Sequence, residues 1–409
     1  MVTQTMPQME TPRLGPRPLS LHLSTAMAGM MSSLAALPSA LNGSLPWRPE
    51  LAAAAAELTA ELSRSEPGAL FQAVAAECQS RLGTMLAGVQ AYQGAARPDR
   101  SWCMAQAIWR QGTTTLLDYG GAGRPCLFVP SLVNRAHVLD LTRDRGLLGW
   151  LRQQGHRPFL VDWGAPGEAE LEFSLSDYIA RLRAVLEVVE DTAPGPPALV
   201  GYCMGGDLAL ALAQQRQEVL SGLALLATPW DFQAGAQQWP GIDALAPGLD
   251  SMLEGFGALP VDVLQALFAA LDPGLAQRKF CHFASLDPDG AEAAHFVALE
   301  DWVNDGVPLA AQVARDCLQG WYGGNTTARG AWLIDGHAVD PSLLKLPVLA
   351  AIPENDRIVP AASAQALADA IPQADIIRPA AGHIGMVVGR RGKSGLWQPL
   401  SNWLQSLDE

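Results

Sequence analysis

The chain has 409 residues, of which 49% are hydrophobic and 17% are charged. This composition excludes a largely disordered chain and predicts one large folded domain with an appended or inserted part. The formal net charge of -14 disfavours nucleic acid as a partner, because no basic face of useful size is visible to replace the counterions of the phosphates.

Six cysteines and seven histidines are scattered along the chain without any C-x-x-C pair. The pattern predicts reduced thiols in the cytoplasm, no disulfide framework, no bound metal and no resident cofactor. Residues 23–43 are rich in small residues, and one interpretation of them is a targeting signal. Ser, Thr, Gly and Pro interrupt this stretch, which favours a surface-associated segment over export and predicts no transmembrane span.

The first part of the chain predicts little regular structure and then helices. Residues 1 to about 48 are rich in Pro, Ser and Met, and we expect them to be irregular. Two stretches that each begin at a proline, 49–64 and 67–93, show the apolar spacing of helices. We therefore predict an irregular and helical N-terminal extension over residues 1–95.

From residue 96 onward, strands and helices alternate. Ser174 and Asp177 form a capping box at the start of an amphipathic helix over 174–192. Apolar runs that predict buried strands lie at 124–133, 156–164, 197–203, 222–230, 346–356 and 375–379. Buried strands that alternate with helices are typical of a mostly parallel sheet flanked by helices, so we assign residues 96–409 to an α/β domain.

A helical insertion interrupts this alternation. Residues 231–329 show helical patterns, and we interpret them as a lid over one end of the sheet. Tryptophans gather in and around this segment, and each one could equally be part of a helical core; they are Trp230, Trp239, Trp302, Trp321 and Trp332.

The stretch GYCMGG predicts a sharp turn between a strand and a helix, with Cys203 at its tip. Gly201, Gly205 and Gly206 allow the strand and the helix to approach closely. The thiol lies at the N-terminal end of the helix, where unpaired amides and the helix dipole favour the thiolate. We interpret Cys203 as a nucleophile; the alternative is a small buried apolar residue.

A nucleophile on such a turn needs a histidine base and an acid that orients it, in the chain order nucleophile, acid, histidine. Asp356 follows a late strand, and His383 lies in the loop after the last strand. We predict that these two residues complete the site. The competitors are less well placed along the chain; they are Glu354 and Asp340 for the acid and His337 for the base.

An oxyanion that forms during acyl transfer needs two preorganised N–H donors. We predict the amide of Met204, directly after the nucleophile, as one donor. The other should come from the loop after an early strand, with Val133 as the first choice and Leu132 close behind.

Several stretches together resemble the poly(3-hydroxyalkanoate) synthases, closest to the short catalytic-subunit type called class III. The resemblance covers roughly residues 95 to 407, and the stretches that carry it, in chain order, are VPSLVNRAHVLDL, FLVDWGAPG, GYCMGG, LLATPWDF, ALEDWVNDG, VLAAIPENDRIVP and GHIGMVVG. One departure is Asp207, where the family usually has Thr or Ser.

The resemblance implies an α/β-hydrolase fold with a helical lid and a Cys-His-Asp triad, falling on Cys203, His383 and Asp356. It implies acyl transfer from (R)-3-hydroxyacyl-CoA, as a substrate, to a growing polyester chain. It also implies a homodimer or a partner subunit. The helical N-terminal region is the candidate to bind a partner subunit, a second copy of the chain or the surface of polyester granules in the cytoplasm, and the sequence does not choose among these.

Two questions stay open from the sequence: which residues bind CoA, and which reaction the site carries out. Arg390 and Arg391 beside Lys393, together with Arg135, are candidates to bind the phosphates of CoA, whereas the alternative is a solvated basic loop. The alternative functions are a polyester depolymerase, a thioesterase or a dienelactone hydrolase-like enzyme, and an inactive granule-associated paralogue. The triad residues alone do not separate these enzymes, because hydrolysis and synthesis differ only in which nucleophile reaches the acyl-enzyme.

Overall fold

The structure is a computed structural model of the chain, and it describes residues 13–235 and 242–407. The chain divides into two compact units. Unit 1 comprises residues 1–98 and 265–304, and unit 2 comprises residues 99–264 and 305–409.

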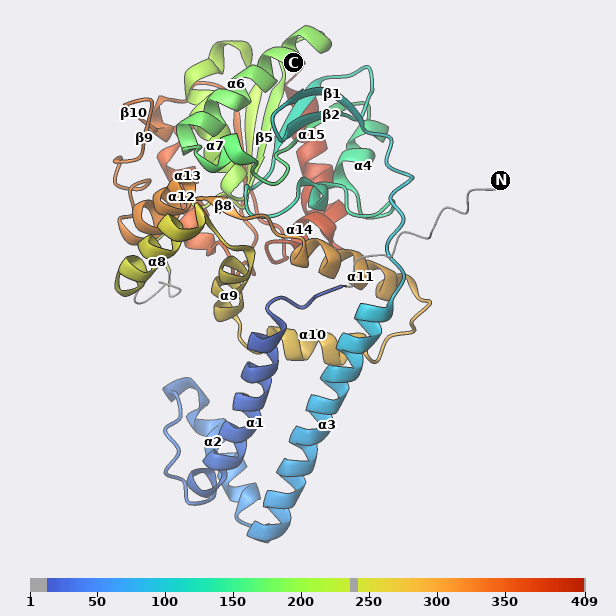
Figure 1. Cartoon of the computed structure of the whole chain (residues 1–409), viewed down its shortest axis with the longest axis vertical. Coiled ribbons are helices and arrows are strands. Elements are labelled where there is room, and N and C mark those ends of the chain that lie inside the picture. Colours follow the sequence, from blue (N-terminus) through green and yellow to red (C-terminus); the bar gives the residue numbers. More distant parts are fainter. Residues whose placement is uncertain (1–12, 236–241, 408–409) are drawn as a thin grey trace. The chain divides into compact units, whose positions relative to one another are not determined.

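Unit 2 is built on an eight-stranded sheet (Figure 1). Its strand order is β1-β2-β4-β3-β5-β6-β11-β12. In chain order the strands are β1 (Gln106–Gln111), β2 (Thr114–Asp118), β3 (Pro125–Val129), β4 (Arg157–Asp162), β5 (Ala198–Tyr202), β6 (Gly222–Leu226), β11 (Val348–Ala351) and β12 (Ala374–Ile377). All pairs from β4 to β12 in this order are parallel, whereas β1 pairs with β2 and β2 with β4 in antiparallel fashion.

The mostly parallel sheet predicted from the sequence is therefore present, with two strands that the sequence analysis missed. β3, β5 and β6 are fully buried, as their apolar runs predict. β1 and β2 form a hairpin at one edge of the sheet. The residues of β1 are mostly exposed, so this strand lacks the apolar run that marked the others.

Helices flank this sheet (Figure 1). α6 (Leu175–Thr192) begins with the predicted capping box, in which Ser174 accepts a hydrogen bond from the amide of Asp177. The other helices around the sheet are α4 (Leu147–Gln153), α5 (Glu168–Leu171), α7 (Met204–Arg216), α13 (Ala361–Ala370), α14 (Gly385–Val388) and α15 (Gln398–Ser406), with short 3-10 helices η2 (Ala136–Leu139), η3 (Gln217–Val219) and η5 (Pro341–Leu343) and the π-helical turn η6 (Lys393–Trp397).

The segment between β6 and β11 is mainly helical, as its spacing predicts. Its elements are α8 (Ile242–Phe256), α9 (Val261–Leu271), α10 (Leu275–Phe283), α11 (Ala291–Asn304), α12 (Ala311–Arg315) and the π-helix η4 (Asp316–Gly323). Two small two-stranded sheets complete it, one of β7 (Ala258–Leu259) and β8 (Leu309–Ala310), the other of β9 (Leu333–Ile334) and β10 (His337–Ala338).

Unit 1 is helical and has its own core. It contains α1 (Leu19–Leu41), η1 (Pro49–Leu51), α2 (Ala52–Leu62), α3 (Pro67–Gly94), most of α9, and α10 and α11. The core residues come from α1, α3, α10 and α11 and include Ala26, Met85, Val89, Tyr92, Phe280 and Val297.

Two expectations for the N-terminal region differ from the structure. Irregular structure up to about residue 48 was wrong for Leu19–Leu41, which form α1. Leu19, Leu23 and Ala26 lie on one stripe of this helix and pack into the core of unit 1, so tertiary burial stabilises a helix that has no charged first or last turn. Residues 265–304, which we assigned to the lid, group with the N-terminal helices.

The tryptophans around the insertion are buried wherever the structure describes them. Trp230, Trp321 and Trp332 pack edge to face in unit 2, and Trp302 is buried in unit 1. Trp239 lies outside the described residues.

The close packing of α3 against α10 in unit 1 gives a stability prediction. A Cβ at Gly88 would overlap the backbone of Phe280, so we expect Gly88→Ala to destabilise the protein by about 1–3 kcal/mol. Gly83 lies in the same helix with nothing within 4 Å of an added Cβ. Gly83→Ala is the matched control and should stabilise the protein by about 0.5–1 kcal/mol. Urea unfolding measures both, and equal effects would contradict the packing argument.

Candidate functional site

Cys203 lies at the tip of a sharp turn between β5 and α7. Its backbone angles are φ 55° and ψ -132°, and a positive φ is uncommon for a residue other than glycine. Such strain persists only where the surrounding structure holds it in place, and it is concentrated at functional sites. The side chain is partly exposed and stands at the N-terminal end of α7.

The glycines around Cys203 allow the close approaches that this turn requires. A Cβ at Gly201 would overlap the backbone of Gly206, and one at Gly206 would overlap the side chain of Thr228. A Cβ at Gly205 would overlap the carbonyl of Pro130, in the loop that follows β3. The contact at Gly201 is the close approach of strand and helix that the sequence predicts. Gly205 and Gly206 bring the turn against two further segments, at Pro130 and at Thr228.

The strand order brings the other two predicted residues to the same edge of the sheet as Cys203. β5, β6, β11 and β12 are neighbours and run parallel, so their C-terminal ends lie together. Asp356 lies in the loop after β11, and His383 lies in the loop after β12.

Asp356 and His383 form a buried pair. The Nδ1 atom of His383 lies 2.7 Å from Oδ2 of Asp356, and the Asp356 side chain is fully buried. The other carboxylate oxygen, Oδ1, accepts hydrogen bonds from the amides of Ile358 at 2.8 Å and Val359 at 2.9 Å. These two amides hold the carboxylate in a fixed orientation toward the imidazole.

His383 also interacts with Cys203, and this changes its protonation. Burial by itself lowers the pKa of His383. The negative charge of Cys203, the hydrogen bonds with Asp356 and Cys203, and the charge of Asp356 together outweigh burial and raise that pKa to about 10. The arrangement therefore favours a protonated His383 imidazole at neutral pH.

Tyr202 supports the imidazole and was missed by the sequence analysis. Its ring lies 5.2 Å from the His383 ring at an interplanar angle of 31°, and its hydroxyl donates to the carbonyl oxygen of His383 at 3.4 Å. Tyr202 directly precedes Cys203, but no pattern in the sequence shows that its ring packs on a residue from a distant loop.

The two predicted oxyanion donors lie on segments that meet at the turn. Met204 begins α7, whose first amides lack partners within the helix. Val133 lies in the loop after β3, where its amide donates to Oγ of Ser131 at 3.1 Å. A substrate oxygen at the Val133 amide would have to replace this internal acceptor.

Of the three competing residues, one caps a 3-10 helix and two are exposed at the surface. The Asp340 side chain accepts a hydrogen bond from the amide of Ser342 and caps η5. Glu354 is exposed, and His337 is exposed in β10. None of them takes part in the Asp356–His383 pair.

The basic candidates lie at the surface of unit 2. Arg390 and Arg391 are exposed and follow α14, the helix after His383. Arg135 lies next to the loop with Val133, and its Nε is 3.5 Å from Oδ2 of Asp305. Among residues 13–235 and 242–407, His, Cys, Asp and Glu side chains nowhere gather in threes or more as a metal site would need.

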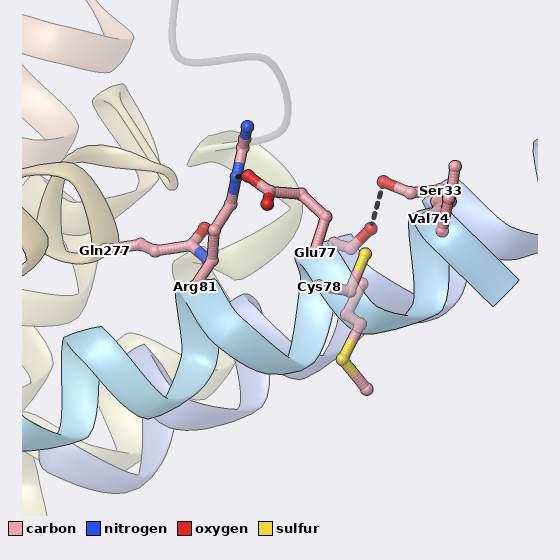
Figure 2. A pocket seen from close by; sticks show the side chains of 9 residues that line it. Ser33, Val74, Glu77, Cys78, Arg81 and Gln277 are labelled. Atoms are coloured by element: carbon pink, nitrogen blue, oxygen red, sulfur yellow. Dashed lines mark hydrogen bonds and ion pairs between the residues drawn. The ribbon is translucent and has the colours of Figure 1, made fainter.

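A pocket of about 510 Å³ lies within unit 1 (Figure 2). None of the predicted site residues lines it. It is lined by Gly29, Met30, Ser33, Ala73, Val74, Glu77, Cys78, Arg81 and Gln277. Its charged residues, Glu77 and Arg81, pair with each other at 2.7 Å along one helix. Such exposed pairs contribute little energy, and we assign no function to this pocket.

Comparison with known proteins identifies the fold family. The family model described as the alpha/beta hydrolase fold matches residues 144–389, which span β5, the turn at Cys203, Asp356 and His383. The chain belongs to the α/β-hydrolase fold family. The predicted fold class is thereby confirmed.

This α/β-hydrolase is also similar in sequence to curated polymerase subunits. It is 28% identical to the poly(3-hydroxyalkanoate) polymerase subunit PhaC of Haloferax mediterranei, over 74% of this chain and 64% of that protein. It is 29% identical to the subunit of the same name from Haloarcula marismortui, over 68% of this chain and 60% of that protein. The resemblance to poly(3-hydroxyalkanoate) synthases is thereby confirmed as homology. The matched part of this chain spans less than two thirds of the length of each of these two relatives.

Two further comparisons give another curated relative and a solved structure. The corresponding subunit of Allochromatium vinosum is 27% identical over 68% of this chain and 80% of that protein. A solved structure of a thermophilic esterase from Thermogutta terrifontis covers 74% of this chain and 97% of its own, with 20% identity and a TM-score of 0.47. Within the described ranges, every helix is too short or too polar to span a lipid bilayer.

Proposed function

We propose that this protein is an acyltransferase that moves 3-hydroxyacyl groups from CoA to a growing polyester chain through an acyl-enzyme on Cys203. The observation that carries the proposal is Cys203 on its strained turn beside a buried His383–Asp356 pair. The homology to poly(3-hydroxyalkanoate) polymerase subunits gives the substrate class.

In the first step, the thiolate of Cys203 attacks the thioester carbonyl carbon of the acyl-CoA. The carbonyl oxygen becomes an oxyanion that the amide of Met204, and that of Val133 once it leaves Ser131, would stabilise. The bond from the carbonyl carbon to the CoA sulfur then breaks, and the protonated His383 donates its proton to the leaving sulfur.

In the second step, the neutral His383 accepts the proton of a 3-hydroxyl group as that oxygen attacks the acyl-enzyme. An ester bond forms, the bond to the Cys203 sulfur breaks, and thiolate and imidazolium are restored. Exchange of one thioester for another is nearly balanced in free energy, so the acyl-enzyme retains the driving force for ester formation. This is the advantage of a thiol over a serine hydroxyl here.

Synthesis also requires that water be kept from the acyl-enzyme. The parts of the predicted lid that fold with the sheet, 231–264 and 305–329, include Tyr322 of η4, whose pKa is raised by burial and by the negative charge of Cys203. Its ring contacts Phe232 at 4.7 Å between centroids. An aromatic wall beside Cys203 fits a lid that excludes water.

An assay with 3-hydroxybutyryl-CoA tests the proposal by following free CoA and polymer together. CoA release with polymer supports the acyltransferase. CoA release with free 3-hydroxybutyrate indicates a thioesterase, and no CoA release would refute both enzymes. Raising the concentration of the purified protein tests whether activity requires a second copy of the chain, and adding polyester granules tests whether it requires their surface.

The exposed arginines after α14 give a prediction about substrate binding. If Arg390 and Arg391 attract CoA phosphates, changing both to Glu should raise the KM for acyl-CoA about fivefold to tenfold at low salt, with little change in kcat. The increase should shrink as salt is added, because screening weakens long-range attraction. Arg64→Glu with Arg81→Glu in unit 1 changes the net charge equally and serves as the control. A KM that is equal in both double variants would leave Arg390 and Arg391 as a solvated basic loop.

A further inference from the structure

Asp207 differs from the other buried acids of unit 2. It lies in the first turn of α7, four residues after Cys203, and is 0% exposed. Neither of its carboxyl oxygens has a hydrogen-bond partner among the residues that the structure describes. By contrast, Asp356, Glu170 and Asp140 each accept at least one hydrogen bond from a backbone amide.

Burial without a partner determines the charge of this carboxyl. An ionised carboxylate is costly in an apolar interior, and such a group takes up a proton instead. Burial, and then the negative charge of Cys203, raise the pKa of Asp207 well above its usual value. Asp207 is therefore a neutral acid at neutral pH.

The titratable groups that face Asp207 do not supply a positive charge. Cys317 and Tyr322, both from η4, interact electrostatically with Asp207, and burial raises the pKa of each, so both are neutral. The electrostatic contribution of Cys203, at the start of α7, is that of a negative charge, because it raises the pKa of Asp207. The hydroxyl of Thr228, next to Gly206, is polar but uncharged.

The charge of Asp207 matters because of where it lies on α7. The N-terminal end of a helix carries roughly half a positive charge, which stabilises an anion placed there. The Cys203 thiolate and the oxyanion at the Met204 amide both form at this end. A neutral Asp207 leaves that positive charge to them, whereas an ionised Asp207 would oppose it and repel both anions.

We propose that Asp207 is a positioning residue whose neutral form leaves the positive end of α7 to the anions at Cys203, and whose ionisation at alkaline pH suppresses acyl transfer. The inference rests on the proposed function. It accounts for an acid at a position where the resemblance leads one to expect Thr or Ser.

The test compares Asp207→Asn with the unaltered protein in single-turnover CoA release from 3-hydroxybutyryl-CoA, between about pH 6 and about pH 10. The Asn side chain is neutral at every pH, so the variant should release CoA at neutral pH at a rate within about threefold of that of the unaltered protein. The alkaline decline of the rate should begin about one pH unit higher in the variant. A decline at the same pH in both proteins would overturn the proposal, as would a loss of about a hundredfold at neutral pH in a folded variant.

Two further variants and an infrared measurement complete the test. Asp140→Asn changes another buried acid whose pKa is raised by burial, and it should leave the alkaline decline where it is. Asp207→Ser replaces Asp207→Asn if the latter does not fold, with the same expected shift. Infrared difference spectra against the variant should show a protonated carboxyl at neutral pH. A carboxylate signal from Asp207 at neutral pH would overturn the proposal, whether or not the protein releases CoA. Absence of CoA release would refute the proposed function separately.

Discussion

Replacing Cys203 by serine should lower the rate of CoA release from 3-hydroxyacyl-CoA by about a thousandfold or more. The serine hydroxyl is far less acidic than a thiol, so it cannot supply the negative charge that raises the pKa of His383. A serine ester would also lose the driving force of the thioester before the new ester bond forms. Mass spectrometry of the protein after incubation with acyl-CoA should find an acyl group on Cys203 and none in the variant.

Cys78→Ser is the matched control for this experiment. Cys78 is a partly buried free cysteine of α3 in unit 1, and its replacement should leave CoA release unchanged within about twofold. Turnover and product that survive Cys203→Ser would refute the covalent mechanism. Equal losses in both variants would point to a general effect on folding.

Replacing Asp356 by asparagine should reduce CoA release by about a thousandfold to ten-thousandfold while the fold is retained. The carboxylate accepts the hydrogen bond of Nδ1 of His383 and is itself held by two amides, whereas an asparagine amide can present a donor there and favour the wrong tautomer. The effect should lie mainly in kcat, because Asp356 is expected to act on the imidazole rather than on the bound substrate.

The same substitution should change the pH dependence. Burial lowers the pKa of His383, and the charge of Cys203, the hydrogen bonds and the charge of Asp356 raise it to about 10. Without the carboxylate the pKa falls, so the imidazolium that protonates the leaving CoA is lost at a lower pH than in the unaltered protein. Rates measured from about pH 6 to about pH 10 check this. Glu354→Gln is the control, since Glu354 is an exposed acid only two residues away. An alkaline decline that does not move in Asp356→Asn would contradict the assigned role.

Much of the fold was predictable because it depends on local sequence. The apolar runs of β3, β5 and β6 mark strands that are buried on both faces, and the capping box at Ser174 marks the start of α6. The hairpin of β1 and β2 was missed because an exposed edge strand needs no apolar run. α1 was missed because its apolar stripe of Leu19, Leu23 and Ala26 is recognisable only once the core of unit 1, against which it packs, is known.

The candidate site was predictable to a similar degree. The turn at Cys203 depends on glycines within five residues, so its backbone is a local property of the sequence. Asp356 and His383 were chosen from their order relative to predicted strands, and the strand order explains why their loops lie together. The packing of the Tyr202 ring on the His383 ring joins two distant segments, so no spacing along the chain specifies it.

The sequence by itself therefore determined the alternation of strands and helices and the turn at Cys203, because both follow from neighbours within a few residues. It predicted the three triad residues from chain order. Only the tertiary structure decided that residues 265–304 group with the N-terminal helices and that the Asp207 carboxyl is buried without a hydrogen-bond partner among the described residues. Both depend on which distant side chains exclude water from a surface or a carboxyl group, and that exclusion exists only after the chain has packed.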